Sequence, residues 1–184
     1  MRSFLELVQT RRSIRKFADR PVERDKILTC LEAARWAPSA EHVQPWRFVV
    51  VDDPALKEKL AAAAFSGIYA PTRWAAAAPV LIALIAKPDV LANRLGARIQ
   101  GTNYYLLDMG IAGEHLVLQA HEIGLGTCWI GWFSERGARK ALGVSRRYRI
   151  VSLIALGYPA HTPLKPKARK RLEEICRFNT SEGL

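Results

Sequence analysis

Residues 11–17 read Arg11-Arg12-Ser13-Ile14-Arg15-Lys16-Phe17, a stretch that places four cationic side chains and a hydroxyl around an apolar isoleucine. If the backbone is extended here, alternate side chains point to opposite faces. Arg11, Ser13 and Arg15 then share one face, and the residues between them share the other. Two guanidinium groups beside a hydroxyl suit a phosphate, because arginine binds phosphate oxygens in pairs and stays charged. Taken alone, such a basic heptad is more often a solvated charge run than a phosphate site, and the rest of the chain has to decide between the two.

The bulk properties predict one globular domain spanning residues 1–184. The chain has 184 residues, of which 49% are hydrophobic, so it can bury a substantial core without a disulfide framework. Lysine and arginine exceed aspartate and glutamate by 28 − 17 = 11. This excess favours anionic partners, such as phosphorylated cofactors, nucleic acid or acidic membranes, without choosing among them.

The cysteines and the apolar runs restrict the class further. Cys30, Cys128 and Cys176 lie far apart and form no C-x-x-C pair, so we expect no metal site and a reducing compartment. The charged amino-terminal segment predicts no signal peptide. The longest apolar run, residues 79–86, is too short to span a bilayer. We therefore expect a cytoplasmic protein with no membrane partner.

Residue patterns predict helices that alternate with short strands. Helices are expected at residues 4–10, 23–36, 54–65, 100–123 and 134–142, and strands at residues 47–51, 79–86, 127–131 and 148–156. Residues 66–78 fit either a helix or a packed loop. The 100–123 segment is apolar on nearly all sides, which predicts a buried core helix shared with a second subunit.

Several familiar motifs are absent from the sequence. No G-x-G-x-x-G follows a predicted strand, and there is no Walker A loop, H-E-x-x-H or G-x-S-x-G. A Rossmann dinucleotide site, a P-loop and a serine nucleophile elbow therefore have no support.

Four stretches, in order and spacing, resemble the FMN-dependent nitroreductase family over residues 4–175. They are residues 11–17; residues 37–40 with 44–46; residues 124–131; and residues 156–159, followed by 167–169 and 172–175. Each stretch is weak alone, but four in the right order are hard to obtain by chance.

This resemblance implies an α+β fold with a central, mainly antiparallel sheet flanked by helices and a long buried helix at a dimer interface. It also implies a homodimer with two FMN sites between the subunits. The implied activity is that of an FMN-dependent NAD(P)H oxidoreductase with two half-reactions. NADH or NADPH passes hydride to flavin N5, and a small-molecule acceptor such as a nitroaromatic or quinone then takes the electrons. The cofactor carries this chemistry, so no catalytic side chain is assigned.

The resemblance assigns the basic stretch to the phosphate and one edge of the flavin. Arg11 and Ser13 would contact the ribityl phosphate, with Arg12 beside them. Arg15 would lie near the pyrimidine edge, where a fixed cation favours the anion formed on reduction.

Further cofactor contacts are implied elsewhere in the chain. Lys167 and Arg169 match a K-x-R pair that closes the phosphate pocket, with a solvated basic tail as the alternative. Pro38, Ser39 and Ala40 would reach the flavin from the partner subunit, with a plain helix-ending loop as the alternative.

The 127–131 strand would pass the N5 edge of the flavin through Ile130 and Gly131, where a backbone N–H could bond N5. Cys128 on the same strand is interpreted as a small buried hydrophobe. Trp129 and Trp132 alternate faces, so one could line the pocket while the other packs in the core.

Some features remain open at this point. His42 stands where relatives commonly carry asparagine, and it fits a structural or a functional role. Residues 66–74 and 87–100 are expected to shape the acceptor pocket. The competing functions are a basic nucleic-acid-binding module, which lacks a recognition motif, a flavin-binding protein without turnover, and a flavin enzyme with another specialised acceptor.

Overall fold

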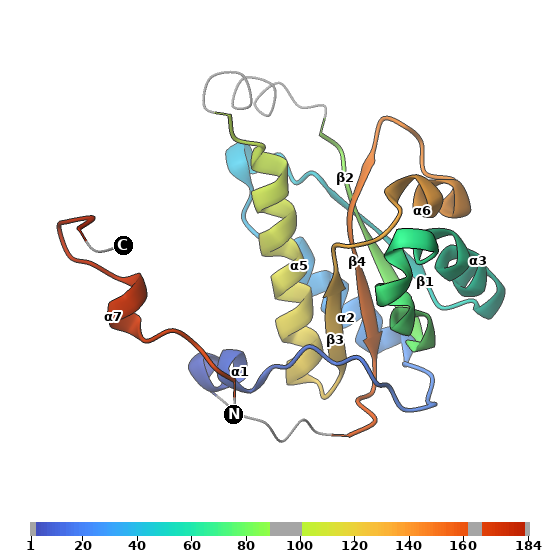
Figure 1. The fold of residues 1–184 in the computed structure, drawn as a ribbon, viewed down its shortest axis with the longest axis horizontal. Helices are drawn as coiled ribbons and strands as arrows, with labels where there is room; N and C mark the ends of the chain where they lie inside the picture. The colour runs from blue at the N-terminus through green and yellow to red at the C-terminus, as the bar shows by residue number, and fades with distance from the viewer. Residues whose placement is uncertain (1–2, 89–100, 162–166, 183–184) are drawn as a thin grey trace.

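The computed structural model describes residues 3–88, 101–161 and 167–182 and has a four-stranded antiparallel sheet at its centre (Figure 1). The strands are β1 (Trp46–Val51), β2 (Val80–Ala86), β3 (Gly126–Ile130) and β4 (Arg149–Gly157), in the order β1-β2-β4-β3. Every neighbouring pair is antiparallel. The sheet and its flanking helices confirm the predicted α+β class.

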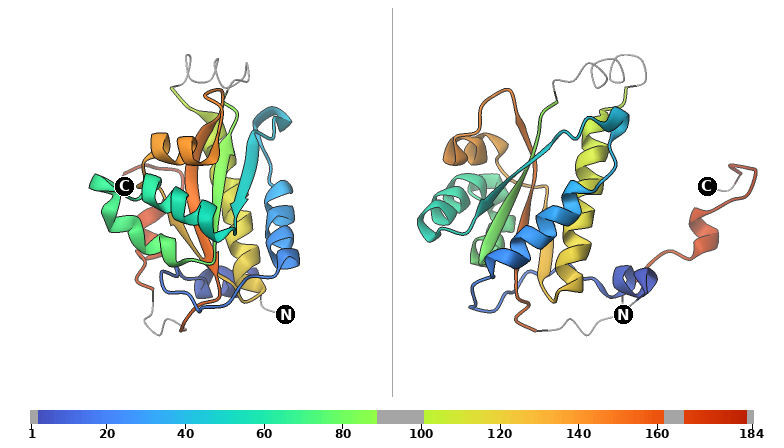
Figure 2. Two further views of the ribbon diagram at one scale, coloured as in Figure 1. Left: turned by 90° about the vertical axis from the view of Figure 1, so that its right-hand side faces the viewer. Right: turned by 180° about the vertical axis from the view of Figure 1, so that it is seen from behind.

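Strand β2 shows why the chain forms two layers of core around this sheet. All of its side chains are buried, and they alternate between the two faces. Ile82 and Leu84 pack with α2 (Arg24–Arg35) and α5 (Tyr104–Glu122), whereas Leu81 and Ala83 pack with α3 (Pro54–Ala64) and α6 (Glu135–Leu142). Figure 2 shows the two pairs of helices on opposite sides of the sheet.

Local capping signals set the helix boundaries. Ser3 and Glu6 form a capping box at α1 (Phe4–Thr10), in which each side chain accepts from the other residue's N–H. Asp53 caps α3 through the Leu56 N–H at 2.8 Å. Gly143 ends α6 with φ of 66°, a left-handed conformation that glycine adopts without strain.

The segment that could not be assigned from the sequence is a 3-10 helix, η2 (Gly67–Ala77), which contains Pro71. Proline removes a backbone donor, so a regular α-helix is disfavoured here. A second short 3-10 helix, η1 (Ala40–His42), follows α2. Of the 87–100 stretch, residues 89–100 lie outside the described part of the chain.

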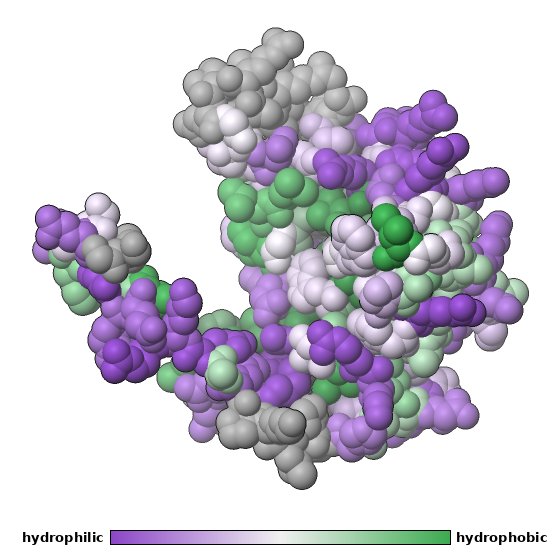
Figure 3. All heavy atoms as spheres, viewed as in Figure 1, coloured by the Kyte–Doolittle hydropathy of each residue, from purple (hydrophilic) through white to green (hydrophobic). Residues whose placement is uncertain are grey.

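Helix α5 is the long core helix, but one of its faces is exposed in the single chain. Its buried stripe includes Met109, Ala112 and Leu116, whereas Leu107 is 56% exposed and Ile111 is 39% exposed. Figure 3 shows apolar side chains gathered over the upper part of this helix. The helix is therefore apolar on nearly all sides, as predicted, but the single chain buries only one stripe of its apolar surface.

The carboxyl-terminal segment leaves the body of the molecule. Residues 167–182, which include the one-turn helix α7 (Leu172–Ile175), extend away from the sheet (Figures 1 and 2). Leu172, Ile175 and Phe178 are all exposed on this arm. None of the helices in the described ranges is both long enough and apolar enough to cross a membrane.

Candidate functional site

The basic stretch runs extended beside the edge strand β3, as its alternation predicts. Ser13 forms a parallel bridge with Thr127, and the Ile14 N–H donates to the Thr127 carbonyl oxygen at 2.8 Å. Ile14 is buried against Gly126, where an added Cβ would lie 2.7 Å from the isoleucine side chain. One apolar residue thus anchors the stretch and leaves its polar neighbours at the edge of the sheet.

The face shared by Arg11, Ser13 and Arg15 surrounds the thiol of Cys128. Burial raises the pKa of this thiol, while the charges of Arg15 and Arg11 and a hydrogen bond with Ser13 act in the opposite direction. Arg15 also lies over the ring of Trp74, with its guanidinium carbon 5.7 Å from the ring centroid. Cys128 is buried, as expected for a small apolar residue.

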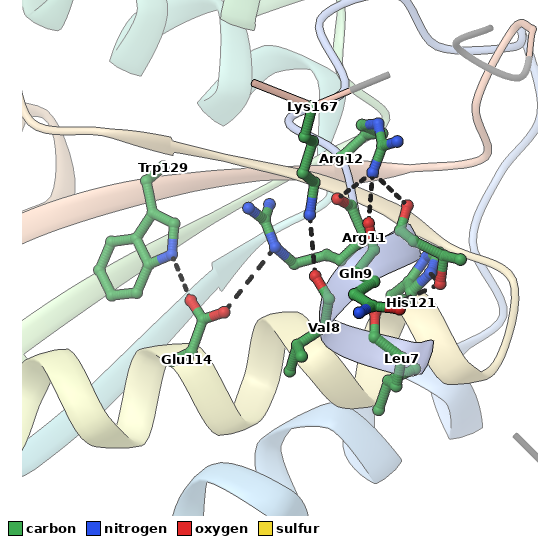
Figure 4. A network of polar contacts seen from close by, with 10 residues as sticks. Leu7, Val8, Gln9, Arg11, Arg12, Glu114, His121, Trp129 and Lys167 are labelled. Atoms are coloured by element: carbon green, nitrogen blue, oxygen red, sulfur yellow. Dashed lines mark hydrogen bonds and ion pairs between the residues drawn. The ribbon is translucent and has the colours of Figure 1, made fainter. Parts of the chain in front are cut away.

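Arg12 points the other way, toward the carboxyl end of α1. Its Nη1 donates to the carbonyl oxygens of Gln9, Thr10 and Arg11 at 2.7, 3.1 and 3.1 Å (Figure 4). A cation here satisfies the unpaired carbonyls and the negative end of the helix dipole. Its Nε is buried and has no hydrogen-bond partner within the described residues, so one guanidinium donor is still free.

The two carboxyl-terminal cations join this cluster across a separation of more than 150 residues. Lys167 Nζ donates to the Val8 carbonyl oxygen at 2.8 Å. Its pKa is lowered by burial first, and then by the charges of Arg11, Arg12 and Arg169. Arg12, Lys167 and Arg169 line one open hollow of about 580 Å³ with Val8 and Gln9. A group of like charges in one hollow favours an anionic ligand.

Sequence reasoning missed an acidic residue at this site. Glu114 on α5 lies 3.8 Å from Arg11, measured from Oε1 to Nε, and its Oε2 accepts a hydrogen bond from Trp129 Nε1 at 3.4 Å (Figure 4). A lone glutamate on a long helix carries no sequence signal for such a contact. The tertiary packing of α5 against β3 creates it.

The end of β3 has an open backbone. Ile130 is buried, whereas Gly131 is exposed and has no heavy atom within 4 Å of an added Cβ. Packing within the chain therefore does not require glycine here, and the missing side chain leaves room for a ligand beside the backbone.

The two tryptophans of this region lie on opposite faces. Trp129 packs against α5, where an added Cβ on Gly113 would lie 2.1 Å from the indole. Trp132 is 55% exposed; its Nε1 donates to the Ile68 carbonyl oxygen at 3.0 Å, and its ring lies 5.2 Å from that of Tyr69. Trp132 and η2 thus form an exposed aromatic wall next to Gly131.

The Pro38–Ala40 segment lies at a different level of α5. The Ala40 N–H donates to Asp108 Oδ1 at 3.0 Å, whereas Thr10 next to the basic stretch contacts His121 at 2.9 Å. These two helix positions are about 20 Å apart along the axis at 1.5 Å per residue. A single chain therefore does not bring Pro38–Ala40 together with the basic stretch.

The loop that follows Ala40 has an unusual backbone. Glu41, His42 and Gln44 have φ of 49°, 57° and 49°, which is the left-handed region that non-glycine residues rarely adopt. His42 Nε2 lies 2.8 Å from Nε2 of the Gln44 side chain. The backbone N–H of Gln44 donates to Ser39 Oγ at 2.9 Å. His42 thus has a structural partner within its own loop.

Comparisons with known proteins identify the family to which this chain belongs. The family model described as the nitroreductase family matches residues 8–158. The NADH dehydrogenase of Thermus thermophilus is 34% identical over 191 residues, and the match covers 90% of each chain.

Solved structures agree with this assignment. A nitroreductase family protein from Clostridium novyi has a TM-score of 0.77 and 35% identity, with 89% of each chain covered. An FMN-dependent nitroreductase from Clostridium difficile has a TM-score of 0.76 and 28% identity, with 96% of this chain and 99% of that one covered. The chain belongs to the nitroreductase family.

Proposed function

We propose that this protein is an FMN-dependent NAD(P)H oxidoreductase of the nitroreductase type. The observation that carries the proposal is the gathering of Arg11, Arg12, Lys167 and Arg169, with the Ser13 hydroxyl nearby, at one end of the edge strand β3. Like charges repel one another, and a dianionic phosphate would offset that repulsion. Supporting evidence comes from the solved structure of an FMN-dependent nitroreductase that is 28% identical to this chain.

Two features of the chain fit a flavin phosphate and ring. Arg12 Nε is a buried donor without a partner in the described residues, and it adjoins the hollow lined by Lys167 and Arg169. Gly131 leaves open space where any other residue would place a Cβ. In this proposal the phosphate is held by Arg11, Ser13, Lys167 and Arg169, with Arg12 beside them. Arg15 lies by the pyrimidine edge, and the backbone of Ile130 and Gly131 faces the ring.

When bound, FMN supplies the redox chemistry, accepting hydride from NADH or NADPH and passing it to a nitroaromatic, quinone or similar acceptor. The residues of the chain bind and orient. Arg15 supplies a fixed cation, held by the Trp74 ring, that stabilises negative charge near it. Trp132 supplies an exposed aromatic surface next to Gly131, which suits a flat acceptor.

We further propose that the functional unit is a homodimer. Leu106, Leu107 and Ile111 leave an apolar face of α5 uncovered, and Leu172, Ile175 and Phe178 are exposed on an arm that leaves the body. Burying such surfaces against a second copy is favourable at about 25 cal/mol per Å². A second copy would also supply Pro38, Ser39 and Ala40 to a site that a single chain cannot complete.

The visible spectrum of the freshly purified protein tests the proposal. We expect flavin absorption, about one releasable FMN per chain, and bleaching by NADH or NADPH that an added acceptor reverses. Bleaching without reoxidation by any acceptor would favour a flavoprotein without turnover. A protein that stays colourless after incubation with FMN would refute the proposed function.

Substitutions in the phosphate cradle, which is formed by Arg11, Arg12, Lys167 and Arg169, test the assigned cofactor-binding residues. Arg11→Ala and Arg169→Ala should fold normally but contain little flavin, because a hydrogen bond to a charged group contributes about 1.5–3 kcal/mol. The exposed Lys140→Ala on α6 serves as the control and should retain full flavin content. Normal flavin content in both arginine variants would refute the phosphate assignment.

A further inference from the structure

Glu114 lies next to the phosphate cradle, and each of its two carboxylate oxygens contacts a neighbouring side chain. Oε1 faces Arg11 at 3.8 Å, and Oε2 accepts from the Trp129 indole N–H at 3.4 Å (Figure 4). The Arg11 side chain is 18% exposed, and that of Glu114 is 46% exposed. The pair is therefore partly shielded from water, while solvent still reaches one side of the glutamate.

The position of Trp129 is itself fixed by packing. Its indole lies against Gly113, and the closest atom would be 2.1 Å from an added Cβ at that position. Any larger residue at position 113 would displace the indole. The close approach of α5 to β3 thus directs the indole N–H at Glu114 and keeps the carboxylate toward Arg11.

Glu114 also lies within the electrostatic field of the other cations. The charges of Arg11, Arg12 and Arg169 lower the pKa of Lys167, whereas Glu114 raises it. Over the described ranges of the chain, Glu114 is the acid that lies within ion-pair distance of this cluster. Two other cations of the cradle, Arg12 and Lys167, donate hydrogen bonds to uncharged backbone carbonyl groups of α1.

We propose that Glu114 is the internal counter-ion of the phosphate cradle and that it weakens the binding of phosphorylated flavins by competing for Arg11. The inference rests on the proposed function and adds a determinant of ligand choice to the same site. A phosphate dianion placed near Arg11 is repelled by the carboxylate, because like charges at a few ångströms interact appreciably even in water. A flavin without a phosphate carries no such charge. Glu114 therefore narrows the preference of the site for FMN over riboflavin.

The test compares Glu114→Gln with wild type by titrating the flavin-free, full-length protein with FMN and with riboflavin. Glutamine keeps the shape of the side chain and can still accept the Trp129 N–H. We expect FMN to bind roughly threefold to tenfold more tightly to the variant, with riboflavin affinity unchanged. The gain should shrink as salt is added, since mobile ions screen partly exposed charges.

The matched control is Glu58→Gln, which removes the same charge from an exposed position on α3, across the sheet from α5. It should leave both affinities unchanged. Unchanged or weaker FMN binding by Glu114→Gln would overturn the inference, as would equal tightening for both flavins. If wild type binds FMN and Glu114→Gln binds it with the same affinity, this inference alone is refuted. A wild-type protein that binds neither flavin refutes the proposed function and this inference with it.

Discussion

Replacing Gly137 by alanine should destabilise the fold at the contact between α3 and α6. A Cβ at this position would lie 2.1 Å from the Ala63 carbonyl oxygen and 2.8 Å from the carbonyl carbon. Both atoms belong to the backbone, so no side-chain rotation can relieve the clash. The contact is tied further by Ser134, whose Oγ accepts from the Gly137 N–H at 3.1 Å and whose N–H donates to the Ala64 carbonyl oxygen at 2.8 Å.

The magnitude follows from opposing effects. Overpacking a tight contact costs about 1–3 kcal/mol, and disturbing the Ser134 cap costs about 1 kcal/mol more. Alanine in place of glycine recovers up to about 1 kcal/mol of helix propensity. We therefore expect the Gly137→Ala variant to lose about 2 kcal/mol in the free energy of unfolding. For a chain of this length, that loss corresponds to a melting temperature about 4–8 °C lower.

Urea-induced unfolding followed by circular dichroism measures this difference. Lys140→Ala, an exposed substitution on the same helix, is the control and should change stability by less than about 0.5 kcal/mol. A Gly137→Ala variant as stable as wild type would show that α6 can move away from α3 freely, which would refute the argument from close backbone packing.

Three further predictions concern the site and its supports. Gly131→Ala should keep the stability of wild type, because nothing lies within 4 Å of the added Cβ, but should lower flavin content; normal flavin content would contradict the assigned role. Tyr158→Phe should raise the pKa of Glu23 from about 2 toward 4.5, because the Tyr158 hydrogen bond is the largest cause of its depression. The stabilisation from Glu23 is present above about pH 4.5 and is lost as the pH falls toward 2, so the free energy of unfolding of the variant should depend less on pH in this window. An NMR titration in which the Glu23 pKa is the same in the variant as in wild type would exclude the Tyr158 hydrogen bond as the cause. Burial raises the pKa of Asp108, so wild type should lose stability as the pH rises through that pKa. Asp108→Asn keeps an acceptor for the Ala40 N–H and should flatten this dependence; parallel pH profiles of unfolding would contradict it.

Most of the secondary structure could be predicted from local signals. The helices expected at residues 4–10, 54–65 and 134–142 lie within about one residue of those observed, and their ends carry local signals: the capping box of Ser3 and Glu6, the Asp53-Pro54 start and the Gly143 stop. The all-apolar run at residues 79–86 correctly marked a central strand. Residues 66–78 resisted assignment because Pro71 interrupts a pattern that is otherwise compatible with a helix.

Part of the candidate site could also be predicted from the sequence. Alternation along an extended backbone predicted that Arg11, Ser13 and Arg15 share a side, and the bridge between Ser13 and Thr127 confirms the extended backbone. Order and spacing of motifs alone led to the nitroreductase family, which the family match over residues 8–158 confirms. The roles of Pro38, Ser39 and Ala40 and the dimer remain predictions, since they depend on a second copy.

The strands, the helix ends and the direction in which the basic stretch presents its charges follow from local sequence, because each depends on neighbours a few residues away. The groups that each cation contacts depend on how distant segments pack together. Arg12 turns to the carbonyls of α1, Lys167 returns to Val8, and Arg11 meets Glu114. Each of the last two contacts joins residues more than 100 positions apart, and no periodicity encodes such a distance. Packing of α5 against β3 places Glu114 beside Arg11, and with it sets the electrostatic balance of the site.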